Sequence, residues 1–161
     1  MRATGTWVLC ALALAGAGGG SGWAEPTVTV NTTHYDIQGK NADQLKRQMK
    51  RLGPNGFWAY TSWYIRWSGS CAVSLEIDYT YPRWTDRDSA PSRLRERWDR
   101  MLTNLTLHEE GHGQIGLDAA REIHDTQCEG DPTKIIDKWV RYEKKYDKET
   151  RHGAGQGVTL D

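Results

Sequence analysis

Hydrophobic and polar positions alternate along the first part of the chain, which is typical of β-strands. Residues 27–30 alternate, and a second alternating series contains Trp63, Ile65 and Trp67. After the turn-forming residues 68–70, a third series continues through Val73, Leu75, Ile77, Tyr79 and Tyr81. A period of two on both sides of a short turn predicts a half-buried antiparallel hairpin.

A short helix is expected between the first strand and this hairpin. Asn41 can cap it, and Leu45, Met49 and Leu52 then recur at helical spacing. The Gly-Pro-Asn-Gly run at residues 53–56 ends the pattern. The N-terminal half is therefore expected to be antiparallel strands with one short helix.

The period becomes helical after Ser89. Pro91 suits a first helical turn, and one face then carries Leu94, Trp98, Met101 or Leu102, Leu105, His108 and His112. Three glycines at positions 111, 113 and 116 are expected to weaken or bend this helix before it resumes over residues 117–126. A turn at residues 129–132 precedes a last helix marked by Ile135, Ile136, Trp139, Val140, Tyr142 and Tyr146. Strands first and helices after predict an α+β fold, with residues 25–161 as a single domain.

The first 24 residues resemble a secretory signal peptide. Arg2 is followed by an uncharged, mostly apolar run at residues 7–17, and small residues at 22 and 24 suit cleavage near Ala24. That run is about half the roughly 20 residues that a membrane-spanning helix needs. We therefore expect a secreted or periplasmic protein with no stable membrane insertion after the signal is removed.

Charge and cysteine content narrow the function classes. The 161 residues contain 21 Lys plus Arg and 21 Asp plus Glu, so the chain lacks the basic field that nucleic-acid binding requires. Cys10 lies in the predicted signal, which leaves Cys71 and Cys128. An even pair in an exported chain predicts one disulfide, and a pair of thiolate metal ligands is the alternative.

Residues 108–112, His-Glu-Glu-Gly-His, match the pattern H-E-x-x-H. Residues four apart on a helix project side by side, so His108 and His112 can bind one zinc ion. Glu109 then lies beside the open position of the metal and can accept a proton from water that zinc has acidified. A structural histidine pair is the alternative interpretation.

A zinc site of this kind needs a third protein ligand. Asp118 follows His112 by six residues, but on a continuous helix it points about 120° away from the ligand face. Asp147 extends the apolar face of the last helix, and His152 lies just beyond that helix. All three remain candidates on spacing alone.

Several segments together resemble the bacterial family called domain of unknown function 922. They are residues 35–39, the Gly53-Pro54 step, the Trp-rich strand, residues 70–73, residues 81–84, the H-E-x-x-H segment and residues 146–153. The family is described as predicted secreted zinc-dependent proteases, so the resemblance implies an envelope or extracellular location. Because it includes residues 146–153, it favours His152, followed by Asp147, over Asp118 as third ligand. Two features of other zincins are missing, a Glu about twenty residues after His112 and a Met-turn.

The sequence thus predicts a secreted zinc metallopeptidase that acts on a peptide or protein substrate, with Glu109 as general base and His108, His112 and His152 as ligands. The alternative is a non-catalytic binding module of the cell envelope that keeps zinc for structure. An enzyme acting on peptidoglycan cross-links would share the chemistry. The pattern specifies no oligomeric state.

Overall fold

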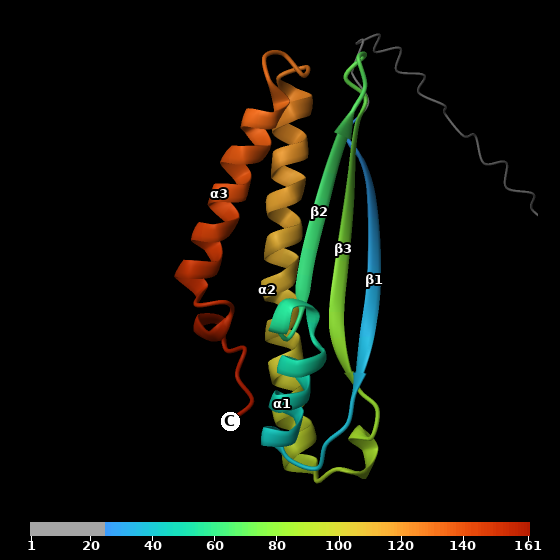
Figure 1. Ribbon diagram of the computed structural model, residues 1–161, viewed down its shortest axis with the longest axis vertical. Coiled ribbons are helices and arrows are strands. Elements are labelled where there is room, and N and C mark those ends of the chain that lie inside the picture. The colour runs from blue at the N-terminus through green and yellow to red at the C-terminus, as the bar shows by residue number, and fades with distance from the viewer. Residues whose placement is uncertain (1–24) are drawn as a thin grey trace, which may run out of the picture.

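The computed structural model describes residues 25–161, so the predicted signal segment and Cys10 lie outside the described residues. The chain forms β1 (Thr27–Ile37), α1 (Ala42–Leu52), β2 (Tyr60–Trp67), β3 (Val73–Trp84), α2 (Ser92–Asp125) and α3 (Pro132–Thr150). Short 3₁₀ turns occupy Pro54–Gly56, Arg87–Ser89 and Ala154–Gln156. Strands precede the two long helices, which confirms the α+β class (Figure 1).

The sheet is mixed, with the strand order β1-β3-β2. The β2–β3 hairpin is antiparallel as expected, and its register places Trp63 opposite Ile77 and Ile65 opposite Leu75. The first strand differs from the expectation, because β1 pairs with β3 in parallel, with Val30 opposite Ile77. The reason lies in the connection: α1 and the following turn carry the chain from β1 to the opposite edge of the sheet, where β2 runs antiparallel to β3, so β3 returns between the two edge strands in the direction of β1.

The predicted cap of α1 is confirmed. The Asn41 side chain accepts a hydrogen bond from the Gln44 amide at 3.0 Å, and the Gln44 side chain accepts one from the Lys40 amide at 2.7 Å. This reciprocal arrangement satisfies two backbone donors at the helix start. Leu45 and Met49 are fully buried, whereas Leu52 at the helix end is exposed.

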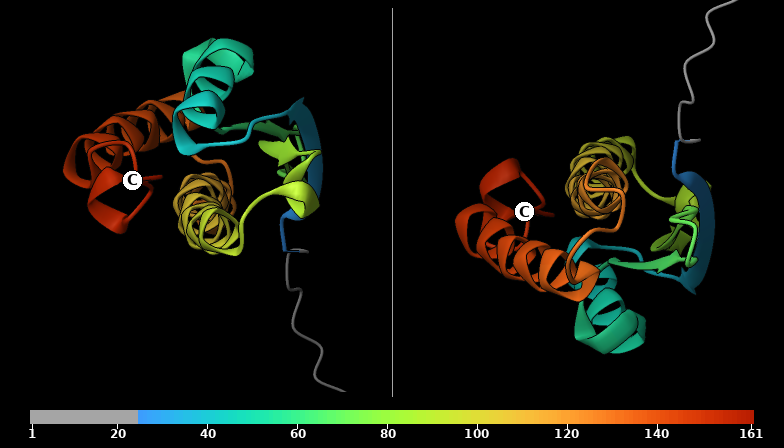
Figure 2. Two further views of the ribbon diagram at one scale, coloured as in Figure 1. Left: turned by 90° about the horizontal axis from the view of Figure 1, so that it is seen from below. Right: turned by 90° about the horizontal axis from the view of Figure 1, so that it is seen from above.

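Helix α2 lies between the sheet and α3 (Figures 1 and 2). Its apolar face contributes to two clusters, one around Trp98, Met101 and Leu105 with α1, and one around Ala120 and Ile123 with β3. Helix α3 is more peripheral, with Pro132 its only buried residue. After α3 the chain returns inward, and Val158 and Leu160 enter the first cluster.

The three glycines do not break α2, which runs without interruption over 34 residues. They are sites of close packing instead. A Cβ at Gly111 would lie 2.3 Å from the Tyr146 hydroxyl, at Gly113 1.9 Å from the Tyr79 hydroxyl, and at Gly116 2.6 Å from Cγ of Trp63. The expected interruption before residue 117 is therefore wrong, because packing against α3 and the sheet holds the helix together where propensity alone weakens it.

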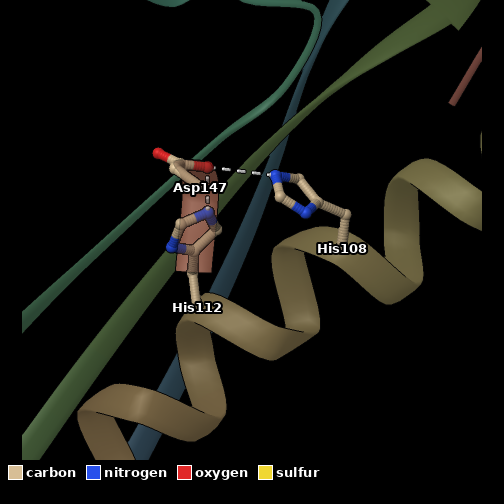
Figure 3. Close-up of side chains that lie close together, drawn as sticks. All are labelled: His108, His112 and Asp147. Atoms are coloured by element: carbon tan, nitrogen blue, oxygen red, sulfur yellow. Dashed lines mark hydrogen bonds and ion pairs between the residues drawn. The ribbon is translucent and has the colours of Figure 1, made fainter. Parts of the chain in front are cut away.

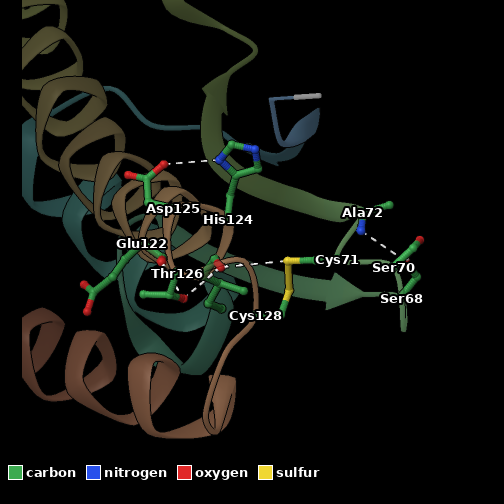
Figure 4. Close-up of a disulfide and its surroundings, with 10 residues drawn as sticks. Ser68, Ser70, Cys71, Ala72, Glu122, His124, Asp125, Thr126 and Cys128 are labelled. Carbon is green, nitrogen blue, oxygen red and sulfur yellow. Dashed lines mark hydrogen bonds and ion pairs between the residues drawn. A yellow bond between two sulfur atoms is a disulfide. The ribbon is translucent and has the colours of Figure 1, made fainter. Parts of the chain in front are cut away.

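Cys71 and Cys128 form a disulfide across 57 residues, which rules out the thiolate-ligand alternative (Figure 4). Cys71 lies just before β3 and Cys128 lies between α2 and α3, so the bond ties the hairpin turn to the start of α3.

Within residues 25–161, no helix has the length and apolar character to cross a membrane.

Replacing both Cys71 and Cys128 with Ser should lower the free energy of unfolding by about 4 kcal/mol, because the bond restricts a long loop in the unfolded chain. Urea unfolding of the oxidised, reduced and double-Ser proteins measures this change. Equal midpoints for all three would contradict the expectation.

Gly116→Ala should destabilise the protein by about 1–2 kcal/mol, because overpacking against Trp63 outweighs the better helix propensity of Ala. Gly69→Ala is the matched control, since a Cβ there meets no atom within 4 Å. Thermal unfolding should separate the two variants, and an unchanged midpoint for Gly116→Ala would refute this account of the glycine.

Candidate metal centre

Two histidines on α2 provide one half of the candidate site. His108 and His112 lie one helical turn apart, and their ring centroids are 4.9 Å apart. Both residues are buried, at 4% and 7% exposure. The two histidines lie on the same face of α2 as the buried residues Trp98, Met101 and Leu105. The apolar pattern of α2 therefore also places the imidazoles in the interior.

The third group comes from α3. Asp147 Oδ1 lies 3.4 Å from His108 Nε2 and 3.2 Å from His112 Nε2. The three side chains point toward one another (Figure 3). The three ligand atoms all lie within 4.8 Å of one another. Two imidazole nitrogens and one carboxylate oxygen converging in this way fit a divalent metal ion, and zinc accepts this donor set.

The other nitrogen of each ring also has a partner. Nδ1 of His108 lies 2.8 Å from Gln156 Oε1, and Nδ1 of His112 lies 3.2 Å from Glu143 Oε1. Histidines that ligate metals usually donate their second N–H to a carboxylate or an amide oxygen in this manner. The surroundings of both rings therefore also fit a metal site.

Tyr146, on α3, packs against both histidines. Its ring stacks on His108 with a centroid distance of 5.2 Å and meets His112 edge-on at 5.1 Å. The Tyr146 hydroxyl donates to the His108 carbonyl at 3.3 Å and accepts from Gln156 Nε2 at 3.1 Å. Gly111 leaves space for this hydroxyl, which explains a glycine inside the H-E-x-x-H segment.

The two rings have opposite electrostatic surroundings. Burial lowers the pKa of His108, and this effect exceeds that of the hydrogen bond to Gln156, which raises it. Burial also acts to lower the pKa of His112, but the hydrogen bond to Glu143 and the charge of Asp147 outweigh it, so the pKa of His112 is raised. The carboxylates around His112 thus create a negative field that also favours a bound metal cation.

Glu109 lies beside the cluster and is 95% buried. The Thr61 hydroxyl, on β2, donates to Glu109 Oε2 at 2.6 Å. Burial raises the pKa of Glu109, while the hydrogen bond from Thr61 and the nearby His112 act in the opposite direction. A carboxyl with a raised pKa, held by one oxygen, has the character of a general base.

A cavity of about 460 Å³ opens onto these groups. Residues 57–59, Leu105 and Val158 form its apolar wall. His108, Glu109, His112, Glu143 and Asp147 form the polar side. The cavity therefore brings the candidate metal ligands and the candidate base to one accessible space.

The remaining candidates lie at or outside the edge of this cluster. His152 lines the cavity but is 60% exposed, with Nδ1 3.4 Å from Asp147 Oδ1 and its ring 5.8 Å from that of Phe57. It is not among the three converging donors, so the structure favours Asp147 over His152 as third ligand. Asp118 contacts Gln114 and Arg121 on another side of α2, as its angular offset predicts.

Sequence reasoning missed three partners of the site, namely Thr61, Glu143 and Gln156. Glu143 had a signal, because it precedes Asp147 by four residues, the same spacing as His108 and His112. Two such pairs on adjacent helices can face each other. Thr61 and Gln156 had no signal, since only the packing of β2 and the C-terminal turn brings them to α2.

Comparisons with known proteins identify a family without a described activity. Residues 32–153 match the model of a family described as "Bacterial protein of unknown function (DUF922)". No curated protein and no solved structure matches the chain. The matched segment contains both histidines, Glu109, Glu143 and Asp147, whereas Gln156 lies beyond it. Because the match covers most of the chain, this protein belongs to the DUF922 family of bacterial proteins.

Proposed function

We propose that this protein is a zinc-dependent hydrolase of peptide bonds that acts outside the bacterial cytoplasm. The observation that carries the proposal is the juxtaposition of His108, His112 and Asp147 with the buried carboxylate of Glu109 in one open cavity. A purely structural histidine pair has no need of a buried acid next to it or of access from solvent.

The number and type of donors support zinc in a catalytic role. Three protein donors, two imidazoles and a carboxylate, are the usual complement of a catalytic zinc site, whereas structural sites generally have four protein ligands. Among residues 25–161, the candidate cluster has three metal-binding donors, one each from His108, His112 and Asp147. A bound zinc ion would polarise the substrate carbonyl and lower the pKa of a water molecule.

The residues of the chain supply the proton transfers and the binding surface. Glu109 takes the proton from the attacking water and gives it to the leaving amine, and Thr61 holds the carboxylate by Oε2 while it does so. The apolar wall at residues 57–59, with Leu105 and Val158, offers a surface for a side chain of the substrate. A short peptide or an exposed loop is the expected substrate.

Two further observations bear on location and partners. The disulfide suits an oxidising compartment such as the periplasm or the extracellular space. The balanced charge offers no attraction to a nucleic acid. We therefore propose an exported protein whose partner is a peptide or protein substrate.

Metal content tests the ligand set. The purified protein should hold one zinc ion per chain after dialysis, and His112→Ala and Asp147→Ala should lose most of it, because each removes a converging donor. Elemental analysis by mass spectrometry gives the stoichiometry.

The exposed His34 provides the matched control, and His34→Ala should keep its zinc. His152→Ala should also keep it. Loss of zinc from His152→Ala together with retention in Asp147→Ala would instead identify His152 as the third ligand.

Glu109→Gln tests the catalytic role, because it keeps the size of the side chain but cannot accept the proton. Zinc content should stay unchanged and the rate of peptide hydrolysis should fall by about 10²–10⁴-fold. Cleavage of a peptide library by the zinc-loaded protein and the variant measures this rate. A wild-type protein that holds zinc and cleaves no peptide would favour the non-catalytic binding module.

A further inference from the structure

One carboxylate on α3 contacts the site without joining the three converging donors. Glu143 Oε1 lies 3.2 Å from His112 Nδ1, and Trp63 on β2 donates to the same oxygen through Nε1 at 3.2 Å. The Glu143 side chain is only 25% exposed. It therefore links β2, α3 and the candidate ligand on α2.

The two carboxylates of α3 contact opposite nitrogens of one ring. Asp147 lies at Nε2 of His112, the nitrogen that faces His108, while Glu143 lies at Nδ1. A neutral imidazole has one N–H and one lone pair, and its hydrogen-bond partners decide which nitrogen has which. A proton held on Nδ1 by Glu143 leaves the lone pair on Nε2, where the other two donors converge.

We propose that Glu143 is a positioning residue that fixes the tautomer and the ring orientation of His112 for metal binding, and that Trp63 in turn fixes Glu143. The inference rests on the proposed metal site but not on hydrolysis. An imidazole without such a partner can rotate about its side-chain bonds and expose either nitrogen, and the loss of a partner of this kind typically weakens metal binding by about 10–100-fold.

His108 provides an internal comparison. Its Nδ1 contacts the neutral amide of Gln156, which receives further support from Tyr146. His112 instead contacts a carboxylate, which also increases the basicity of the ring. The proposal thus assigns the stronger orienting contact to His112 and makes Glu143, rather than Gln156, the more sensitive position.

Zinc affinity, measured by competition with a chromophoric chelator, tests the proposal without reference to catalysis. Glu143→Ala should bind zinc about 10–100-fold more weakly than the wild type. Glu143→Gln should recover most of this loss, because the amide oxygen can still accept from both Nδ1 of His112 and Nε1 of Trp63. Trp63→Phe should show a smaller loss, since it removes only the donor that holds Glu143.

Glu149→Ala is the matched control, because Glu149 lies on the same helix with its side chain 64% exposed and paired to Lys145. It should bind zinc like the wild type. Thermal unfolding of the metal-free proteins shows whether each variant is folded. If Glu143→Ala does not fold, the comparison of Glu143→Gln and Trp63→Phe with the control still decides the matter, since Trp63→Phe must weaken binding more than Glu149→Ala does.

Three outcomes would overturn the inference. Unchanged zinc affinity in Glu143→Ala would show that the contact does not orient His112. A loss as complete as in Asp147→Ala, without recovery in Glu143→Gln, would show that Glu143 is itself a ligand. A wild-type protein that binds no zinc would instead refute the proposed function, so the two failures are distinguishable.

Discussion

The candidate site depends on one polar interface between two helices. Two histidines spaced four residues apart on α2 face two carboxylates spaced four residues apart on α3, inside a protein whose buried side chains are mostly apolar or aromatic. Burying imidazoles costs free energy unless their nitrogens are paired. Here each ring nitrogen has an oxygen partner within 3.4 Å. This pairing fixes both the register of the helices and the direction of the rings.

The rest of the fold supports this interface from both ends of α3. The helix itself buries little, so it depends on its attachments: the disulfide ties the chain just before it to the hairpin, and Val158 and Leu160 anchor the segment after it in the core. Gly111 allows Tyr146 to approach α2 closely enough to pack against both rings. The position of Asp147 is therefore a consequence of contacts distributed along the whole C-terminal third of the chain.

Local patterns were sufficient for the elements and for half of the site. The cap at Asn41, the parity of Trp63, Ile65, Val73, Leu75 and Ile77, and the apolar face leading to His108 and His112 are properties of neighbouring residues, and the structure confirms them. The predicted disulfide is also present. The expected interruption of α2 at its glycines was wrong because helix propensity describes a residue in isolation. Positions 111, 113 and 116 are glycine because side chains of α3 and the sheet pack there and leave no room for a Cβ.

By itself, the sequence determined that two imidazoles would project from one helix face with a glutamate between them, because that geometry follows from helical spacing alone. Only the tertiary structure decided that Asp147 completes the donor set while His152 stays at its edge, that Thr61 holds Glu109, and that β1 lies parallel to β3. These are relations between segments far apart along the chain. They depend on how helices and strands pack against one another, and the periodicity of a single segment contains no information about that packing.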